Sequence, residues 1–348
     1  VCVQLSQGWS WRCESNLCVR SENPDGDATV GNSLSVCRLT CGQYGAIWPQ
    51  PTGVTAISDK VISLDPTSVQ FDFTAVADLS RDAVRDFVYS AGDLFVTNLQ
   101  ALCGGNCSAT SETSFTVHIA TSSGDLTLNW LTDESYSLDI NTRDNRVDVH
   151  IQAETVYGAR HGLETLTQLT TSTDTYHRDS YQLVVVTTAK VSDKPKYPHR
   201  GLLLDSARNY LPLRTILRTI DAMASCKLNV FHWHATDSQS FPLDLPTVPQ
   251  LAKYGAYSGA EVYTTADIKA VVDYARVRGV RVLLELDMPA HAGNGWQWGS
   301  DSGQGNLAVC VNNQPWSQYC LQPPCGQLNP ANPNLYSVLA DVFRDLVD

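Results

Sequence analysis

Hydrophobic and polar residues alternate with a period of two in several stretches between residues 61 and 191. Such alternation is typical of strands that have one buried face. The predicted strands are 69–73, 115–119, 126–130, 136–140 and 146–151. Two stretches with apolar residues near helical spacing, 82–102 and 156–169, predict helices between these strands. The combination indicates an α+β domain whose sheet has one covered face.

The pattern changes after residues 192–199, a stretch rich in proline and charge that we interpret as a linker. Beyond the linker, short and fully apolar segments alternate with amphipathic ones. The predicted strands are 201–205, 228–233 and 280–287, and the predicted helices are 212–225, 264–278 and 334–347. This order is typical of parallel βα units that are covered on both sides.

The number of residues after the linker limits what these units can form. A complete (β/α)₈ barrel needs about 250 residues, whereas about 150 follow the linker. We therefore expect an α/β fold class, with a small α+β N-terminal domain followed by the first part of a (β/α)₈ TIM barrel. The expected divisions are a disulfide-rich segment over 1–48, the α+β domain over 49–192 and the first half of the barrel over 199–348. Leu203, Val230 and Leu284 are expected to face the barrel interior.

The cysteines indicate an oxidising compartment, because most of the eleven occur in close groups. These groups are Cys13 with Cys18, Cys37 with Cys41, Cys103 with Cys107, and Cys310, Cys320 and Cys325. Irregular spacings without C-x-x-C favour disulfides over zinc, which is the competing interpretation. A glycosylation sequon at Asn106 agrees with a secreted protein, extracellular or lysosomal. Cys226 lies within an apolar helical pattern and is predicted to be a buried free thiol.

Charge and hydropathy exclude several classes of partner. The formal net charge is −12 and no run of basic residues occurs, which argues against nucleic acid and anionic membrane surfaces. No apolar run approaches the roughly 18 residues of a membrane span, and no hydrophobic signal segment begins at Val1. We therefore expect a mature, soluble chain that binds a neutral or cationic ligand. No cofactor is expected.

Polar side chains that can carry chemistry follow each of the three predicted strands after the linker. They are Asp205 and Arg208 after the first strand, His232, His234 and Asp237 at the end of the second, and Asp287 and His291 after the third. Catalytic groups of such barrels lie at the carboxyl ends of the strands, so four of these residues are predicted to share one pocket. The four are Arg208, His234, Asp237 and His291. Alternatively, a residue such as Asp205 only caps the next element. His234, Asp237 and His291 do not form a complete ligand set, so no metal is predicted.

A loop rich in glycine and tryptophan follows the third predicted strand. Its aromatic residues are Trp296, Trp298, Trp316 and Tyr319. Indole faces in a polar loop are suited to stacking on the apolar C–H faces of sugar rings. The alternative is that these rings only pack the loop against the rim of the barrel.

Three long strings of residues resemble the β-N-acetylhexosaminidases of glycoside hydrolase family 20. They are 198–210, then 221–234 with 237–242, and 274–291. The resemblance extends from about residue 61 to the end, and the N-terminal segment with its cysteines and tryptophans further resembles the insect chitin-degrading members. It implies a small α/β domain followed by a catalytic (β/α)₈ barrel.

The resemblance also implies an activity, the retaining exo-hydrolysis of terminal N-acetylglucosamine from chitooligosaccharides or glycans. In the family mechanism the substrate's acetamido oxygen attacks the anomeric carbon, an aspartate orients the acetamido group and the adjacent glutamate protonates the leaving oxygen, an exception to the scheme with two catalytic carboxylates. Those acids belong to an H-x-G-G-D-E motif that these 348 residues lack, so they are expected beyond residue 348. A non-catalytic sugar-binding or storage protein on the same fold is the alternative. The D-x-x-D-x-D-x-E motif of the other substrate-assisted chitinases is absent from the sequence.

The resemblance assigns roles to particular residues. Arg208 matches the arginine that holds hydroxyls of the terminal sugar, and Asp237 matches an active-site aspartate. His234 and His291 match histidines that support the acid/base groups. Trp316 is similar to a wall of the substrate site, and Gln322 matches a position near the second sugar where insect enzymes have glutamate. The expected partners are the carbohydrate and either a second copy of the chain or a chain that carries the rest of the barrel.

Overall fold

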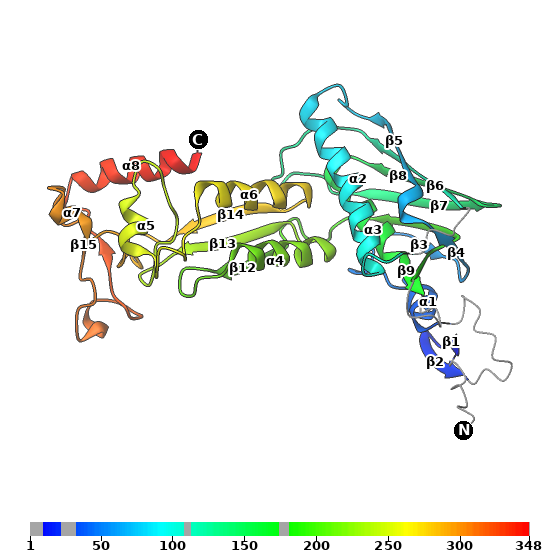
Figure 1. Ribbon diagram of the computed structural model, residues 1–348, viewed down its shortest axis with the longest axis horizontal. Helices are drawn as coiled ribbons and strands as arrows, with labels where there is room; N and C mark the ends of the chain where they lie inside the picture. Colours follow the sequence, from blue (N-terminus) through cyan, green and yellow to red (C-terminus); the bar gives the residue numbers. More distant parts are fainter. Residues whose placement is uncertain (1–9, 22–32, 108–112, 174–180, 348) are drawn as a thin grey trace. The chain divides into compact units, whose positions relative to one another are not determined.

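The computed structural model describes residues 10–21, 33–107, 113–173 and 181–347. It divides the chain into two compact units, Val1–Pro198 and His199–Asp348 (Figure 1). The division falls inside the stretch rich in proline and charge. Both units mix helices with strands, and each has a hydrophobic core of its own.

The N-terminal part of the first unit is a small disulfide-bonded element. Strands β1 (Ser10–Glu14) and β2 (Leu17–Ser21) pair as an antiparallel hairpin, and helix α1 (Leu34–Thr40) follows. Two disulfides, Cys13–Cys41 and Cys18–Cys37, join the hairpin to α1. Because α1 also contributes to the core of the first unit, the disulfides hold the hairpin to a helix that packs on that unit.

A six-stranded sheet dominates the first unit, in the order β3-β11-β7-β8-β6-β5. Its strands are β3 (Thr55–Ile57), β5 (Val69–Val76), β6 (Ser114–Thr121), β7 (Tyr136–Arg143), β8 (Arg146–Ala153) and β11 (Thr188–Asp193). A three-stranded sheet is formed by β4 (Val61–Leu64), β9 (Thr170–Thr173) and β10 (Gln182–Val186), with a 3₁₀ turn η2 (Pro66–Ser68) before β5. Helices α2 (Asp82–Leu102) and α3 (Val156–Gln168) cover one face of the large sheet (Figure 1).

The predicted period-two segments form strands in four of five cases, and the exception has a local cause. Residues 126–130 form a loop rather than a strand. Here Asp125 Oδ1 accepts a hydrogen bond from the Thr127 amide at 2.9 Å, and Asn129 Oδ1 accepts one from the Leu131 amide at 2.7 Å. Such side-chain bonds satisfy the backbone locally and compete with a sheet ladder. Strands β3, β4, β9, β10 and β11 were not predicted.

The second unit is built on a parallel three-stranded sheet, β12 (Gly201–Asp205), β13 (Val230–Thr236) and β14 (Arg281–Leu286). The helices between and after these strands are α4 (Leu213–Ser225), α5 (Gln250–Gly255), α6 (Thr265–Val277) and α8 (Asn334–Val347). A long loop between β14 and α8 contains α7 (Trp298–Asp301), the 3₁₀ turn η3 (Trp316–Gln318) and the short strands β15 (Ala308–Val309) and β16 (Gln327–Leu328). The predicted alternation of strands and helices in this region agrees with these bounds.

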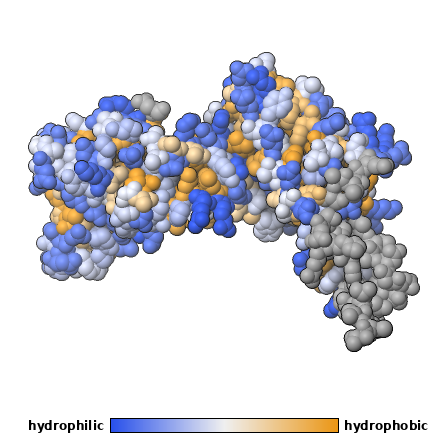
Figure 2. Space-filling model, viewed as in Figure 1, coloured by the Kyte–Doolittle hydropathy of each residue, from blue (hydrophilic) through white to orange (hydrophobic). Residues whose placement is uncertain are grey.

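The two faces of the parallel sheet differ, and one predicted facing was wrong. Trp233 pairs in register with Leu284, and both belong to the core of the second unit, where Trp233 is fully buried. Leu203 and Leu283 lie on the other face, in register with His232, and are 51% and 44% exposed. Because successive side chains of a strand alternate between faces, Leu284 cannot share a face with Leu203 as expected. Hydrophobic residues, orange in Figure 2, are visible on the surface of both units.

Two further disulfides, Cys103–Cys107 and Cys320–Cys325, close short loops. Cys226 is a free thiol as predicted, but it caps the end of α4 and is half-buried rather than buried in the helix. Cys310 is also a free thiol in the structure. Among the described residues, no helix has both the length and the apolar character needed to cross a membrane.

Candidate active site

The carboxyl ends of the three parallel strands carry the polar residues that the sequence singled out. Asp205 ends β12, and its Oδ1 accepts hydrogen bonds from the amides of Ala207 and Arg208 at 3.1 and 3.0 Å. Asp205 thus organises the turn that carries Arg208, which is the capping role considered as the alternative. The turn is fixed to β13, because Trp233 Nε1 donates to Ser206 Oγ at 2.8 Å.

Asp237, directly after β13, is the centre of the cluster. Its side chain is fully buried, with Arg208 Nε 2.9 Å from Oδ2 and His291 Nδ1 3.0 Å from Oδ1. His234 Nε2 lies 3.6 Å from Oδ2. A buried carboxylate is costly unless cations or donors surround it, and these side chains supply such partners. The structure therefore brings together the four residues that the strand-end argument predicted.

Several buried polar atoms of this cluster lack a hydrogen-bond partner. Arg208 Nε and Asp237 Oδ2 are close in space, but the N–H is not directed at the oxygen, so their contact is an ion pair without a formed hydrogen bond. His234 Nε2, Ser238 Oγ and Gln239 Oε1 are also without a partner. Buried polar groups in folded proteins are nearly always satisfied. A concentration of unsatisfied groups at one place favours a site that a polar ligand completes.

A second layer of ionisable groups lies beside Asp237. His234 Nε2 is 3.3 Å from Asp287 Oδ2, and Asp287 is hydrogen-bonded to Glu285. Burial and the hydrogen bond with Glu285 raise the pKa of Asp287 above its usual value. For Glu285, burial acts to raise the pKa, but the hydrogen bonds from Asp287 and His232 outweigh it, so that the pKa of Glu285 falls below its usual value. The pKa values of the two neighbouring acids are thus shifted in opposite directions.

The loop that carries His291 is held against the loop before α8. His291 has a φ of 58°, in the left-handed region that is uncommon for residues other than glycine. The Ala292 amide donates to the Gly326 carbonyl at 3.1 Å, and Leu328 donates to Pro289 at 2.7 Å. A Cβ at Gly326 would lie 2.2 Å from the Cα of Gly293, so this approach requires glycine. The contacts fix where the His291 ring meets Asp237.

The same loops enclose a cavity of about 390 Å³ beside the buried cluster. Its lining includes Ser238, His291, Tyr319 and Gln322. Gln322, predicted to lie near a second sugar, thus shares a cavity with His291. Trp316 is 39% exposed and is not among the lining residues.

The prediction that Trp296 and Trp298 stack on a ligand does not agree with their burial. Both are almost completely buried, and Trp296 packs edge-on against Phe241 with ring centroids 6.1 Å apart. These rings belong to the hydrophobic core of the second unit, which is the alternative considered for them.

Tyr257, in the turn after α5, was missed by the sequence argument. Its hydroxyl donates to the Arg208 carbonyl at 2.8 Å, and burial followed by the nearby charges of Asp205 and Asp237 raises the pKa of the phenol. Tyr257 lies in a short turn without apolar periodicity, and no feature of the sequence would have distinguished it.

Two overlapping sets of side chains could hold a metal ion. They are His234, Glu285 and Asp287, and Asp237, Asp287 and His291, each with ligand atoms within 4.8 Å of one another. In the second set the Arg208 guanidinium, 2.9 Å from Asp237, would repel a dication. In the first set Glu285 is already hydrogen-bonded to His232 and Asp287. The donors are better explained by their mutual bonds than as a metal centre.

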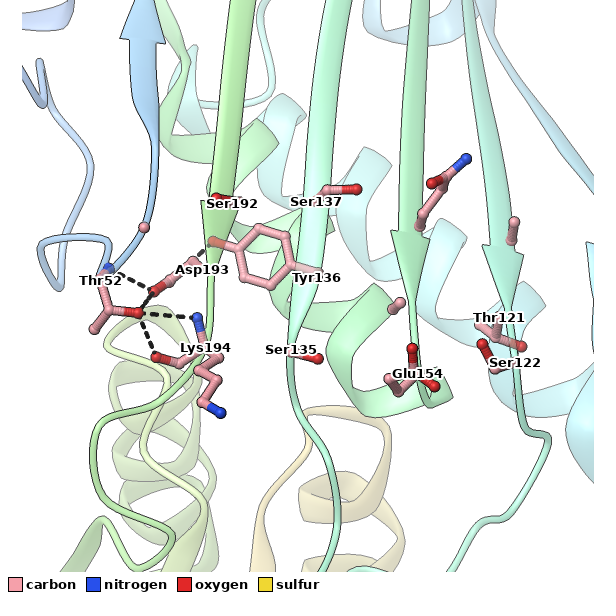
Figure 3. A pocket seen from close by; sticks show the side chains of 14 residues that line it. Thr52, Thr121, Ser122, Ser135, Tyr136, Ser137, Glu154, Ser192, Asp193 and Lys194 are labelled. Carbon is pink, nitrogen blue, oxygen red and sulfur yellow. Dashed lines mark hydrogen bonds between the residues drawn. The ribbon is translucent and has the colours of Figure 1, made fainter.

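A larger cavity, about 830 Å³, lies at the ends of β11, β7, β8 and β6 in the six-stranded sheet of the first unit. Figure 3 shows Tyr136 directed toward Asp193, with Thr52 hydrogen-bonded to Asp193 and Lys194. Burial, with the Asp193 charge as the second cause, raises the pKa of Tyr136 well above its usual value. Hydroxyl groups dominate this cavity, and its described lining includes neither histidine nor arginine. We therefore place the candidate active site in the second unit.

Comparison with known proteins identifies the class. Residues 197–348 match the family described as "Glycosyl hydrolase family 20, catalytic domain", and residues 47–169 match "beta-acetyl hexosaminidase like" sequences. These matches confirm the resemblance to glycoside hydrolase family 20, to which residues 197–348 belong.

The similar proteins include insect enzymes. The chitooligosaccharidolytic beta-N-acetylglucosaminidase of Bombyx mori is 40% identical over 345 residues, which cover 98% of this chain and 55% of that protein. The corresponding Ostrinia furnacalis protein is 39% identical, with coverage of 98% and 55%. The chain thus spans about half the length of these relatives.

Solved structures agree on the fold. The chitobiase of Flavobacterium johnsoniae has a TM-score of 0.62 at 26% identity, over 87% of this chain and 42% of that one. The GH20 exo beta-N-acetylglucosaminidase of Vibrio harveyi has a TM-score of 0.61 at 20% identity, over 97% and 50% of the two chains, and this likeness supports the fold alone.

Proposed function

We propose that the protein carrying this chain is a retaining exo-β-N-acetylhexosaminidase that removes terminal N-acetylglucosamine from chitooligosaccharides or glycans. The observation that carries the proposal is the buried Asp237 carboxylate, held between Arg208 and His291 at the carboxyl ends of parallel strands. The names of the insect relatives agree with this substrate class. In this proposal β12, β13 and β14 are the first three strands of a (β/α)₈ barrel, and residues 49–192 form the preceding α+β domain.

Arg208 is proposed to hold hydroxyl groups of the terminal sugar. Its Nη1 donates to Asp205 Oδ2 at 3.1 Å, its Nε lies 2.9 Å from Asp237 Oδ2, and the side chain remains 36% exposed. Two carboxylates therefore fix one side of the planar guanidinium and leave donors for a ligand. A planar fork of donors suits paired hydroxyl oxygens better than the point charge of lysine does.

Asp237, His234 and His291 are proposed to support proton transfer. The 3.0 Å contact with Asp237 Oδ1 orients His291 Nδ1, which leaves Nε2 free to contact a reacting group or its proton donor. In the family mechanism the substrate's acetamido oxygen attacks the anomeric carbon and a glutamate protonates the leaving oxygen. We propose that the aspartate and glutamate of the D-E motif come from outside these 348 residues.

The remaining roles follow from the loop before α8 and from the relatives. Gln322 is proposed to contact a second sugar from the cavity that it shares with His291, and Trp316 is proposed as a neighbouring wall of the substrate site. The exposed Asn106 is proposed to carry an N-glycan, in line with the four disulfides among the described residues and with a secreted or lysosomal location. A homodimer, or association with the rest of the barrel, is the proposed assembly.

The test replaces Arg208 by lysine in the protein that carries this chain. Hydrolysis of a chromogenic N-acetylglucosaminide should fall about 100-fold or more, because an ammonium group cannot make the paired contacts of the guanidinium. Arg218→Lys is the matched control, since Arg218 is exposed on α4, and it should keep wild-type kcat/KM. Normal turnover in Arg208→Lys would contradict the role. Sugar binding by the wild type without any turnover would favour the non-catalytic sugar-binding or storage protein.

A further inference from the structure

The outer face of the six-stranded sheet in the first unit carries a row of ionisable side chains. Strand register aligns five of them across five neighbouring strands. In order from β5 to β11 they are Asp72, His118, His150, Asp139 and Lys190. The intervening residues Val117, Ile119, Val149 and Ile151 are buried on the side of α2 and α3. Because side chains alternate along a strand, the row faces away from the helices.

Two histidines in the middle of this row lie directly against each other. The rings of His118 and His150 are stacked, with centroids 4.7 Å apart and planes inclined by 11°. His118 Nδ1 lies 3.0 Å from Asp72 Oδ2. Hydrogen bonds from the side chain and the backbone of Thr74, and then the bond with His118, lower the pKa of Asp72 to about 2. Asp72 therefore holds the His118 ring through Nδ1, and the other ring nitrogen, Nε2, is left for a second partner.

The other ring nitrogen, His118 Nε2, lies near a second carboxylate. His118 Nε2 lies 3.8 Å from Oδ1 of Asp148, which is two residues before His150 and on the same face of β8. This distance is too long for a hydrogen bond. Imidazole nitrogen and carboxylate oxygen each bind Zn²⁺ at about 2.0–2.2 Å, so two ligands of one ion can be separated by this distance.

We propose that His118, His150 and Asp148 form a binding site for a divalent transition metal ion, with Zn²⁺ as the representative ion. His118 and Asp148 already lie at the spacing of two ligands. His150 is exposed, so its ring can turn out of the stack to supply the third, and water completes the shell. Asp72 acts on the metal through His118, as the carboxylate that holds the other ring nitrogen of a ligating histidine.

Arg146 is the group that competes with the metal. Its Nε lies 3.0 and 2.9 Å from the two oxygens of Asp148, and its side chain is 64% exposed. Exposed ion pairs of this kind contribute little stability, so a dication can replace the guanidinium at Asp148. It follows that removing the charge of Arg146 should strengthen metal binding.

The test is a calorimetric titration of the metal-free protein that carries this chain with Zn²⁺. Wild type should bind one ion at the outer face of the sheet, and His118→Ala and His150→Ala should each weaken that event at least about 10-fold. Asp72→Asn should weaken it about 10-fold through loss of the supporting carboxylate. Arg146→Gln should tighten it. His234→Ala is the control for the ionisable cluster of the second unit and should leave this event unchanged.

Circular dichroism of each variant shows whether an altered titration reflects binding rather than unfolding. The proposal is overturned if folded His118→Ala and His150→Ala titrate like the wild type. It is equally overturned if only His234→Ala loses the ion, or if the wild type binds no Zn²⁺.

Discussion

The two compact units bury charge in different ways. In the first unit, the buried ions of α3 occur as close pairs, such as Arg160 Nη2 and Glu164 Oε2 at 3.1 Å. In the second unit, the fully buried carboxylate of Asp237 is surrounded by three cationic or titratable side chains, and one of its oxygens has no hydrogen bond. Burial of charge alone therefore does not mark a functional site. Unused hydrogen-bonding capacity beside the charge is the better indicator.

The sheets of the two units differ in a related way. The six-stranded sheet places hydrophobic side chains under α2 and α3 and ionisable side chains on its outer face. The parallel sheet of the second unit instead shows half-exposed Leu203 and Leu283 next to His232 on the face away from its core. This mixture of apolar and titratable groups is suited to the inside of a barrel with a site at its rim.

Replacement of Asp237 by asparagine should have the largest effect on activity. The amide keeps the shape of the side chain but removes the charge that holds Arg208 and His291 in place. We expect kcat/KM on a chromogenic N-acetylglucosaminide to fall about 100-fold or more. Wild-type kinetics in a folded Asp237→Asn protein would show that the buried carboxylate of the second unit is structural, like the buried ion pair of the first unit.

Replacement of Glu164 by glutamine should lower folding stability and leave activity nearly unchanged, the reverse of the effect expected for Asp237→Asn. It leaves Arg160 buried next to a neutral group, and breaking a buried pair typically costs about 3–5 kcal/mol of folding stability. Urea denaturation should show this loss, while kcat/KM per folded molecule stays near the wild-type value. A selective loss of activity at unchanged stability would show that α3 takes part in catalysis.

Most helices and strands that carry these residues could be predicted from the sequence, because their hydrophobic periodicity is regular. The spacing in α2 and α3 and the apolar strands β12 to β14 gave their positions, and strand ends gave Arg208, Asp237 and His291. Residues 126–130 were wrongly predicted as a strand, because the alternation of apolar and polar residues does not reveal local side-chain hydrogen bonds to the backbone. Trp296 was predicted to stack on a ligand, but its side chain is buried in the core of the second unit.

Other parts of the site could not be obtained from local patterns. The Tyr257 hydroxyl donates to the backbone carbonyl of Arg208. Every residue has such a carbonyl, so the sequence gives no sign of this contact. The cavity beside His291 depends on a close approach of Gly293 and Gly326, which are far apart in the sequence. The Gln322 position came from the resemblance to family 20 rather than from periodicity. Contacts of this kind are fixed by tertiary packing.

The smallest expected effect concerns the half-buried Asp72 in the first unit. Its pKa of about 2 lies below the usual value of 3.8, chiefly because of hydrogen bonds from Thr74. A lowered pKa means that the folded state prefers the ionised form, so its stabilisation is complete above about pH 4 and is lost as the pH falls toward about 2. Thermal unfolding from pH 5 to pH 2 should show a shallower decline in Asp72→Asn than in wild type. Identical declines in unfolding temperature would show that ionisation of Asp72 does not contribute to stability.

The position of the bound sugar distinguishes the site of the second unit from the cavity of the first. The most direct measurement is a crystal structure, with N-acetylglucosamine bound, of the protein that carries this chain. We predict that the sugar lies at the carboxyl ends of β12 to β14, with its hydroxyl oxygens within about 3.2 Å of the Arg208 guanidinium nitrogens. A sugar bound instead in the cavity lined by Tyr136 and Asp193, with Arg208 still contacting only protein groups, would contradict it.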